Sequence, residues 1–247
     1  MTLDVLFTPA GLTPAEAQGR TAFVIDILRA TTTMCAALAH GARAIIPAGS
    51  TEEALRLAQT IGTDDVVLAG EKDCVRIPGF QLGNSPLEMT EAAVRGKTLV
   101  VTTTNGTRAL LACQGVAAVY AACAANLGAA AERAREALER EGGLLIVCAG
   151  RDGAFSLDDA YCAGRLVEAV LGDRRRRRGL SDAAIASLDL VRRYGQNWER
   201  PLSRSRAGRE LTRLGFRADL LDAARIDAYP VLPHYHERRV TLAPVPV

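Results

Sequence analysis

The stretch FVIDILRATTTMCAALAHGARAII (23–46) decides the fold class. Its apolar residues 23–27 predict a strand, residues 32–39 predict a helix that ends at Gly41, and the apolar run 44–47 predicts a second strand. A strand, a polar loop, a helix and another strand form the repeating unit of α/β proteins, in which most strands run parallel. The sequence therefore predicts an α/β fold.

The same alternation continues along the chain. Ser50 and Ser85 are each followed three residues later by a glutamate, which is the pattern of a capping box at a helix start. The helix after Ser85 is expected to run to Gly96. Beyond residue 180 we expect a helix, a polar stretch at 201–206 and a short helix that ends at Gly215. Further strands are expected at 66–69, 99–102, 117–121, 144–148 and 240–243.

Two pairs of segments indicate an internal duplication. LVVTTTNGTRALLACQGVAAVY (99–120) can be laid beside 23–46, and CAGRDG (148–153) beside LAGEKD (68–73). The alternative is that strand–loop–helix units simply resemble one another. If the duplication is real, loops from both halves are expected to meet in one cleft. The expected parts are a first α/β half at 1–96, a second at 97–172 and a C-terminal extension packed on the core at 180–247.

Composition predicts an ordinary soluble protein of the cytoplasm. Hydrophobic residues make up 49% of the 247 residues, and the mean hydropathy is +0.08. No apolar run is long enough to span a membrane, and residues 1–11 lack the pattern of a secretion signal. The six cysteines contain no C-x-x-C pair, so we expect reduced core residues and no structural zinc.

The charge distribution argues against nucleic-acid binding. The formal net charge is +2, and without the five arginines at 174–178 it would be −3. Aromatic residues, which a nucleic-acid surface interleaves with basic ones, make up only 4% of the chain. We interpret the arginine run as a solvated connection, with a polyanion-binding patch as the alternative.

Polar side chains gather in four loops that follow predicted strands. Parallel α/β sheets bind ligands at this position, where loops lead into helix N-termini. The TTTNGT loop (102–107) offers hydroxyls and backbone N–H groups, and its glycine permits close approach, so it can hold an anion. Taken alone, the loop can equally be a turn with a helix cap. The candidate residues of the four loops are Asp26, Arg29 and Thr31; Glu71, Asn84 and Ser85; Asn105, Gly106 and Thr107; and Arg151, Asp158 and Asp159.

Asp26 and Glu71 are the best candidates for a magnesium site. Asp26 ends a strand and has an arginine three residues later, a combination that suits Mg²⁺ and a phosphoryl group. A helix cap or a solvated loop acid is the alternative role for each. Asp159 stands three residues after Ser156, as a capping partner does, which leaves Asp158 as the freer ligand by spacing.

One class of phosphatase is disfavoured by direct inspection. VIDILRAT (24–31) superficially follows the strand and Asp-x-Asp-x-Thr pattern of haloacid dehalogenase-type enzymes, but Leu28 occupies the position of the second aspartate. Asp26 as a nucleophile stays open.

Five segments together resemble the 2-phosphosulfolactate phosphatase family, and they occur in the family's order. They are VIDILRATTT (24–33), LAGEKD (68–73), GFQLGNSPLE (79–88), TTTNGTRAL (102–110) and CAGRDGAFSLDDAYCAG (148–164).

This resemblance implies a three-layer α/β/α fold with a mainly parallel or mixed sheet. It also implies Mg²⁺ dependence and hydrolysis of 2-phospho-3-sulfolactate, a step of coenzyme M synthesis. At position 158 the chain has Asp where relatives commonly carry Glu, and at 207 it has Ala where we expect His. The residues that match the family's polar signature by position are Asp26, Arg29, Glu71, Asn84, Asn105, Thr107 and Asp159.

The polar loops and the family resemblance together give one hypothesis for the site. Asp26 and Glu71, with Asp158 or Asp159, hold Mg²⁺. Arg29 and residues 105–107 hold the phosphate, with Thr31 and Ser85 beside them. Arg151 pairs with the sulfonate or carboxylate, and Asn84 orients a ligand or the substrate.

Two alternatives stay open at this point. One is the same chemistry on another phosphorylated carboxylic acid, and the other is a non-catalytic metabolite-binding relative. The partner is a small phosphorylated acid in either case, and a homodimer is kept open on the general frequency of twofold assemblies.

Overall fold

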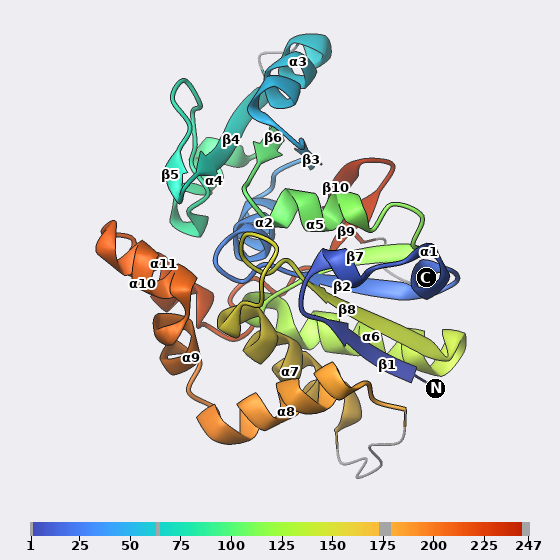
Figure 1. Ribbon diagram of the computed structural model, residues 1–247. Helices are drawn as coiled ribbons and strands as arrows, with labels where there is room; N and C mark the ends of the chain where they lie inside the picture. The colour runs from blue at the N-terminus through green and yellow to red at the C-terminus, as the bar shows by residue number, and fades with distance from the viewer. Residues whose placement is uncertain (1, 63–64, 173–178, 244–247) are drawn as a thin grey trace.

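In the computed structural model, which describes residues 2–62, 65–172 and 179–243, the strands form a ten-stranded sheet flanked by helices (Figure 1). The order across this sheet is β1-β8-β2-β7-β9-β10-β3-β6-β4-β5. The fold is the expected three-layer α/β/α type with a mostly parallel sheet. The strands are β1 Thr2–Leu6, β2 Thr21–Ile25, β3 Ala44–Pro47, β4 Val66–Lys72, β5 Val75–Arg76, β6 Thr98–Thr102, β7 Ala118–Ala122, β8 Gly143–Cys148, β9 Pro233–His236 and β10 Arg239–Leu242.

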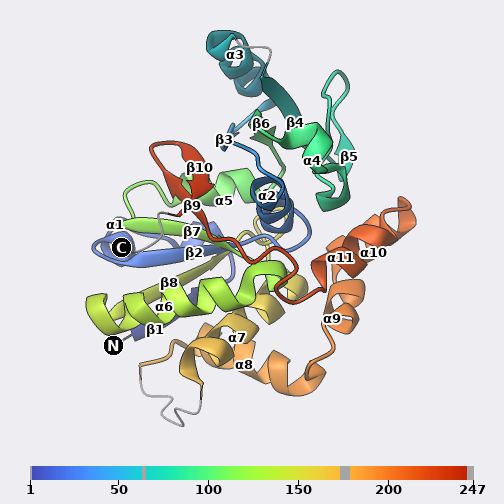
Figure 2. The same ribbon diagram turned by 180° about the vertical axis from the view of Figure 1, so that it is seen from behind.

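The helices fill the connections and the C-terminal part of the described chain. Figure 2 shows α6 lying across the strands β2, β7 and β8. The α-helices are α1 Pro14–Ala17, α2 Ala30–Ala39, α3 Thr51–Ile61, α4 Glu91–Val94, α5 Gly106–Ala112, α6 Leu127–Glu141, α7 Leu157–Leu171, α8 Asp182–Tyr194, α9 Glu199–Arg204, α10 Arg206–Arg213 and α11 Arg217–Ala223. Short 3₁₀ helices are η1 Pro9–Gly11, η2 Pro86–Glu88 and η3 Ala124–Asn126.

The sheet consists of two groups of parallel strands joined by a hairpin from the C-terminal segment. One group is β1-β8-β2-β7, and the other is β3-β6-β4. The hairpin β9–β10 pairs antiparallel with β7 on one side and with β3 on the other, where Val240 faces Ile45. The chain after residue 180 therefore contributes strands to the middle of the sheet as well as helices to its surface.

The strand order is symmetric in a way that agrees with an internal duplication. Exchanging β2 with β6, β3 with β7 and β4 with β8 gives the same order of these six strands read from the opposite edge of the sheet, as a twofold relation around the central hairpin would. These pairs are the ones that the sequence comparison of 23–46 with 99–120 and of 68–73 with 148–153 brings together. The loops after β2, β4, β6 and β8 are thus two related pairs.

The core lies around the central strands β2 and β8. Every residue of these two strands is buried, which is typical of parallel strands covered on both faces. The face of α6 that packs on them is rich in alanine, including Ala130, Ala134 and Ala137, so the helix backbone can approach the sheet closely. Burial of this apolar surface is the main stabilising contribution to the fold.

Several local expectations need correction. Residues 201–206 are not an irregular polar stretch, because α9 and the start of α10 cover them. The helix after Ser85 is split into η2 and α4, because Thr90 caps a new helix through a hydrogen bond from Ala93 N–H. Ser50 does cap α3, accepting a hydrogen bond from Glu53 N–H at 3.1 Å. The arginine run 174–178 lies outside the described residues.

The cysteines are free thiols, and five of the six are buried. No helix in the described part of the chain has the length and apolar character needed to cross a membrane.

Candidate active site

A cavity of about 370 Å³ opens at the ends of β2, β4, β6 and β8, with α10 on its far side. Figure 1 shows α9–α11 standing beside the loop that leads from β8 into α7. The cavity brings together six residues expected from the sequence, namely Asp26, Arg29, Glu71, Asn84, Asn105 and Arg151. Its remaining lining residues, which sequence reasoning did not assign to the site, are Leu28, Asp73, Cys74, Thr104, Asp152, Arg206 and Glu210.

Asp26 lines the cavity and is 8% exposed. Burial raises its pKa to about 7, and the negative charges of Asp158 and Glu71 add to this shift. Its Oδ1 accepts a long hydrogen bond of 3.4 Å from Ala30 N–H, and its Oδ2 accepts none from the described residues. The Asp26 carboxyl therefore lies in surroundings that favour a bound cation or a proton.

Gly106 packs directly against this carboxylate. A Cβ at position 106 would lie 2.6 Å from Asp26 Oδ2 and 2.4 Å from the Cβ of Ala30. Only glycine lets the start of α5 approach the start of α2 this closely. The glycine of TTTNGT thus permits a close approach, as the sequence suggests. What approaches its backbone is the side chain of Asp26.

Glu71 fixes two loops at once. Its Oε2 accepts a hydrogen bond from Cys74 N–H at 2.7 Å, and its Oε1 accepts one from Thr104 N–H at 2.8 Å. The first bond closes the turn after β4, and the second holds the loop after β6. Each oxygen retains a lone pair that can face the cavity.

Asp158 and Asp159 lie behind the cavity wall and do not line it. Asp159 accepts hydrogen bonds from Ile27 N–H and Gly150 N–H, both at 3.0 Å, and so ties the loop after β2 to the loop after β8. The Asp158 carboxylate accepts a hydrogen bond from the Ser156 hydroxyl, so Ser156 does not cap α7 through its side chain. Burial raises the pKa of both carboxyls, and in Asp159 the charges of Asp158 and Asp26 add to the shift.

The capping role that spacing suggests for Asp159 is wrong, because its two oxygens bind backbone groups of other loops.

The cationic groups of the cavity differ in how firmly they are held. Arg29 is 4% exposed, and its guanidinium binds Asp219 Oδ2 at 2.8 Å and the Cys74 carbonyl at 2.6 Å. The Nε of Arg151 is buried and has no hydrogen-bond partner in the part of the chain that the structure describes. Arg206, from α10, is mostly exposed and lies 3.6 Å from Asp152.

Two amide side chains complete the lining. Asn84 is buried, and its Oδ1 has no hydrogen-bond partner among the described residues, so an acceptor oxygen stands unused at the cavity. Asn105 Oδ1 accepts a hydrogen bond from Asp152 N–H at 3.2 Å, which joins the loops after β6 and β8. An orphaned buried oxygen of this kind commonly marks a place where a ligand binds.

The other predicted substrate-binding residues support the loops from behind. Thr31 Oγ1 accepts a hydrogen bond from Asp26 N–H, and Ser85 donates to Asp219 Oδ1 at 2.7 Å. Thr107 is fully buried and exchanges hydrogen bonds with Thr103. With Gly106, these residues lie outside the set that lines the cavity.

The residues missed by sequence reasoning on the far side of the cavity, Arg206 and Glu210, come from α10. Their segment contains SRSRAG (203–208), where the expected histidine is replaced by Ala207. Ala207 is buried and does not line the cavity, whereas its neighbour Arg206 does. The only sequence signal was the polar stretch itself.

The cavity residues fit a magnesium ion of the kind that keeps several water ligands. No group of three or more His, Cys, Asp or Glu side chains suited to a metal ion occurs among the residues the structure describes. Mg²⁺ commonly uses only one or two protein carboxylates, with water and substrate oxygens as the remaining ligands. Asp26, Glu71 and the unpartnered Oδ1 of Asn84 face the same cavity and are oxygen donors, which is the chemistry Mg²⁺ prefers.

Comparison with known proteins relates this chain to one family. The sequence model for 2-phosphosulpholactate phosphatase matches residues 6–238. A probable 2-phosphosulfolactate phosphatase of Symbiobacterium thermophilum is 42% identical over 227 residues, which cover 92% of this chain and 96% of the relative. Proteins with the same name are 41% identical in Deinococcus radiodurans, over 86% of each chain, and 32% identical in Clostridium acetobutylicum, over 95% of this chain and 97% of the relative.

Proposed function

The chain belongs to the 2-phosphosulfolactate phosphatase family, and from this premise we propose that it hydrolyses 2-phospho-3-sulfolactate to sulfolactate and phosphate with the help of Mg²⁺. The substrate carries a phosphate ester, a carboxylate and a sulfonate on three carbons. A site for it must bring several positive groups to one small cavity and still leave room for a water molecule.

The observation that carries the proposal is the composition of the cavity. Five carboxylates line it, among them Asp26 and Glu71 at the ends of β2 and β4, together with three arginines, Arg29, Arg151 and Arg206. Phosphoryl transfer needs little covalent help from the protein, so positioning and charge stabilisation account for most of the catalysis. A cavity with carboxylates that can bind a cation and arginines that can bind anions supplies both positioning and charge stabilisation.

Asp26 and Glu71, with Asn84 Oδ1, would hold Mg²⁺. When bound, this ion would neutralise the charge on the phosphoryl oxygens. The pKa of Asp26, raised to about 7 by burial and by its acidic neighbours, also suits an exchange of protons with a water molecule near neutral pH.

The arginines divide the anionic groups of the substrate between them. Arg29 is fixed at the end of β2, next to Asp26, and there it would bind the phosphoryl group. Arg151 has an unused buried Nε and lies on the loop after β8, where it would pair with the carboxylate or the sulfonate. Arg206 is exposed at the rim and would attract the second of these acids.

An assay over a panel of phosphorylated acids tests the proposal. Phosphate release is measured with 2-phospho-3-sulfolactate, phospholactate and phosphoglycolate, each in Mg²⁺ and in excess chelator. We expect the sulfonated substrate to be turned over fastest and chelation to stop the reaction. Faster turnover of phospholactate would instead assign the carboxylic acid as substrate, and no release from any compound would favour a binding protein.

A further inference from the structure

A buried carboxylate from the C-terminal segment reaches the site from behind. Asp219, on α11, is 2% exposed and does not line the cavity. Its Oδ2 accepts a hydrogen bond from Arg29 Nη1 at 2.8 Å, and its Oδ1 accepts one from Ser85 Oγ at 2.7 Å. One carboxylate therefore connects the loop after β2 with the Asn84–Ser85 loop, although these segments lie far from it in sequence.

The same helix start also covers one face of the arginine. The guanidinium carbon of Arg29 lies 4.7 Å from the centre of the Phe216 ring, and Arg29 Nη2 donates to the Cys74 carbonyl at 2.6 Å. A guanidinium has five N–H groups, of which these contacts use two. The three that are left can serve a ligand in the cavity that Arg29 lines.

Burying the Arg29–Asp219 ion pair costs free energy, which indicates that the pair has a role besides stabilising the fold. Burying an ion pair requires removing water from both charges, and an apolar pair of similar volume is often at least as stable. Here each charged partner has further contacts. Asp219 also accepts a hydrogen bond from Ser85, and Arg29 also contacts the Cys74 carbonyl and the Phe216 ring. The arrangement holds one guanidinium in one orientation.

A second buried carboxylate on α11 provides the contrast. Asp222 is 4% exposed, and it binds Arg225 Nη1 at 2.9 Å and the Tyr229 hydroxyl at 3.0 Å. None of these three residues lines the cavity.

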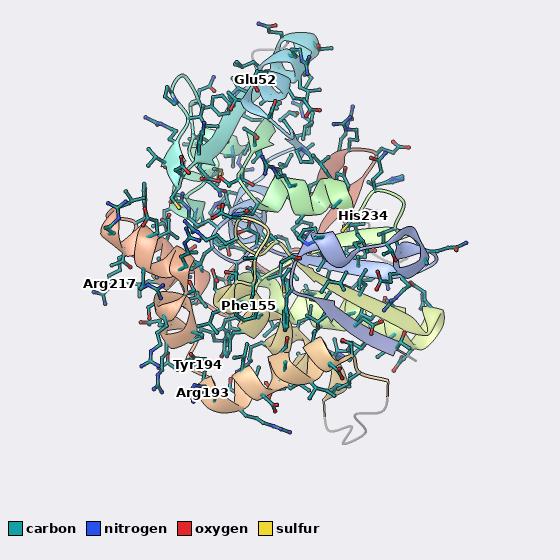
Figure 3. The ribbon with its side chains drawn as sticks, viewed as in Figure 1. Glu52, Phe155, Arg193, Tyr194, Arg217 and His234 are labelled. Atoms are coloured by element: carbon teal, nitrogen blue, oxygen red, sulfur yellow. The ribbon has the colours of Figure 1, made fainter. Side chains whose placement is uncertain are left out.

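Figure 3 shows that Arg217, the first residue of α11, points to the outside of the molecule, so the helix has one face toward the site and one toward solvent.

We propose that Asp219 is a positioning residue that acts through Arg29 and orients its guanidinium toward the phosphoryl group. This inference rests on the proposed function for the identity of the ligand. It assigns to the C-terminal helices a direct part in building the phosphate site. Phe216 has the same role in weaker form, because it holds the guanidinium from its face.

The experiment measures binding of inorganic phosphate by isothermal titration calorimetry in the presence of Mg²⁺, together with steady-state kinetics. Asp219→Asn keeps the shape but removes the charge, and we expect phosphate to bind about 10- to 100-fold more weakly, the effect of a misplaced positioning group. Asp222→Asn, the matched control, is expected to bind phosphate within about twofold of wild type, because it lies outside the site. Phe216→Leu leaves no buried charge unpaired, and it tests the same idea if Asp219→Asn does not fold.

The double variant Arg29→Gln/Asp219→Asn separates positioning from general support. If Asp219 acts through Arg29, the double variant binds phosphate no more weakly than Arg29→Gln alone. Equal losses in Asp219→Asn and Asp222→Asn, additive losses in the double variant, or wild-type affinity in both Asp219→Asn and Phe216→Leu would overturn the proposal. A wild-type protein that binds no phosphate would overturn it too.

Failure of the proposed function has a different signature. If no phosphorylated acid is turned over but phosphate binding weakens in Asp219→Asn and not in Asp222→Asn, the positioning role stands without that function. If turnover of phosphosulfolactate is normal and phosphate affinity is unchanged in both Asp219→Asn and Phe216→Leu, the function stands without the positioning role.

Discussion

The α-carbon of Gly106 lies so close to the Asp26 carboxylate that a methyl group on it would stand 2.6 Å from Oδ2. This contact joins the two related strand–loop–helix units at the centre of the site. It also places Asp26 against a backbone that cannot give way without moving α5. The first prediction follows from it.

Gly106→Ala should abolish most activity while leaving a folded protein. The added methyl group must displace Asp26, Ala30 or the start of α5, and overpacking of this kind costs about 1–3 kcal/mol of the free energy of unfolding. A displaced Asp26 should lower kcat/KM by about 100-fold. Gly96→Ala is the control, because Gly96 has a positive φ of 72° and lies away from the cavity. We expect it to lose stability and keep activity. Similar activity losses in the two variants would show that Gly106 has no special relation to the site.

Stability should depend on pH through Asp26. Burial and the charges of Asp158 and Glu71 raise its pKa from 3.8 to about 7, so the folded protein holds this proton more tightly than the unfolded chain. The stabilisation is fully present below pH 4 and is lost as pH rises through 7, by up to about 4 kcal/mol for the single group.

Urea unfolding between pH 4 and pH 8 without divalent cations measures this effect. Asp26→Asn should reduce the dependence, because an asparagine does not titrate, and the part that remains comes from Asp158 and Asp159, whose pKa values burial also raises. Added Mg²⁺ should restore stability to the wild type at pH 8 and have less effect on the variant. An unchanged pH dependence in Asp26→Asn would mean that Asp26 is already ionised at acidic pH.

Asp159 should matter for the fold more than for the metal. Its two oxygens accept hydrogen bonds from Ile27 and Gly150, so Asp159→Asn turns an NH₂ group toward one backbone donor. A buried donor left without an acceptor costs about 1–3 kcal/mol. Asp158→Asn is the comparison, because the Asp158 carboxylate accepts a hydrogen bond from the Ser156 hydroxyl of its own segment and connects no two loops. The free energy of unfolding and the Mg²⁺ concentration for half-maximal activity are measured for both. A stable Asp159→Asn protein that needs far more Mg²⁺ would make Asp159 a ligand instead.

The regular part of the fold could be predicted because local signals and tertiary structure agree there. The stretch 23–46 forms β2, α2 and β3 within two residues of the expected bounds, and Ser50 caps α3 as its spacing suggests. The hairpin strand β9 was missed. Its sequence PHYH has a proline and two histidines, and its strand conformation depends on pairing with β7, where His234 stacks on Tyr120.

The residues of the candidate site could be predicted where they lie at the ends of strands. They could not be predicted where a long-range contact gives the residue its role. Asp26 and Glu71 line one cavity, as expected from the rule that the ends of parallel strands meet at one edge of the sheet. Asp219 was missed, since nothing in RADLLDA (217–223) distinguishes it from the neighbouring acid at 222. Its role depends on a contact with a loop 190 residues earlier, which only the folded chain makes.

Arg151 should determine which second anion the substrate must carry. Its Nε is buried at the cavity without a partner, whereas Arg206 at the rim is mostly exposed and lies close to Asp152. Arg151→Gln should therefore raise KM for 2-phospho-3-sulfolactate by about 10- to 100-fold, because a buried charge-assisted hydrogen bond contributes about 1.5–3 kcal/mol. Arg206→Gln should raise it only a few-fold, since an exposed pair is worth less than about 1 kcal/mol. With p-nitrophenyl phosphate, which has no second acid, both variants should match wild type. An equal loss with this substrate would move Arg151 to the phosphoryl group.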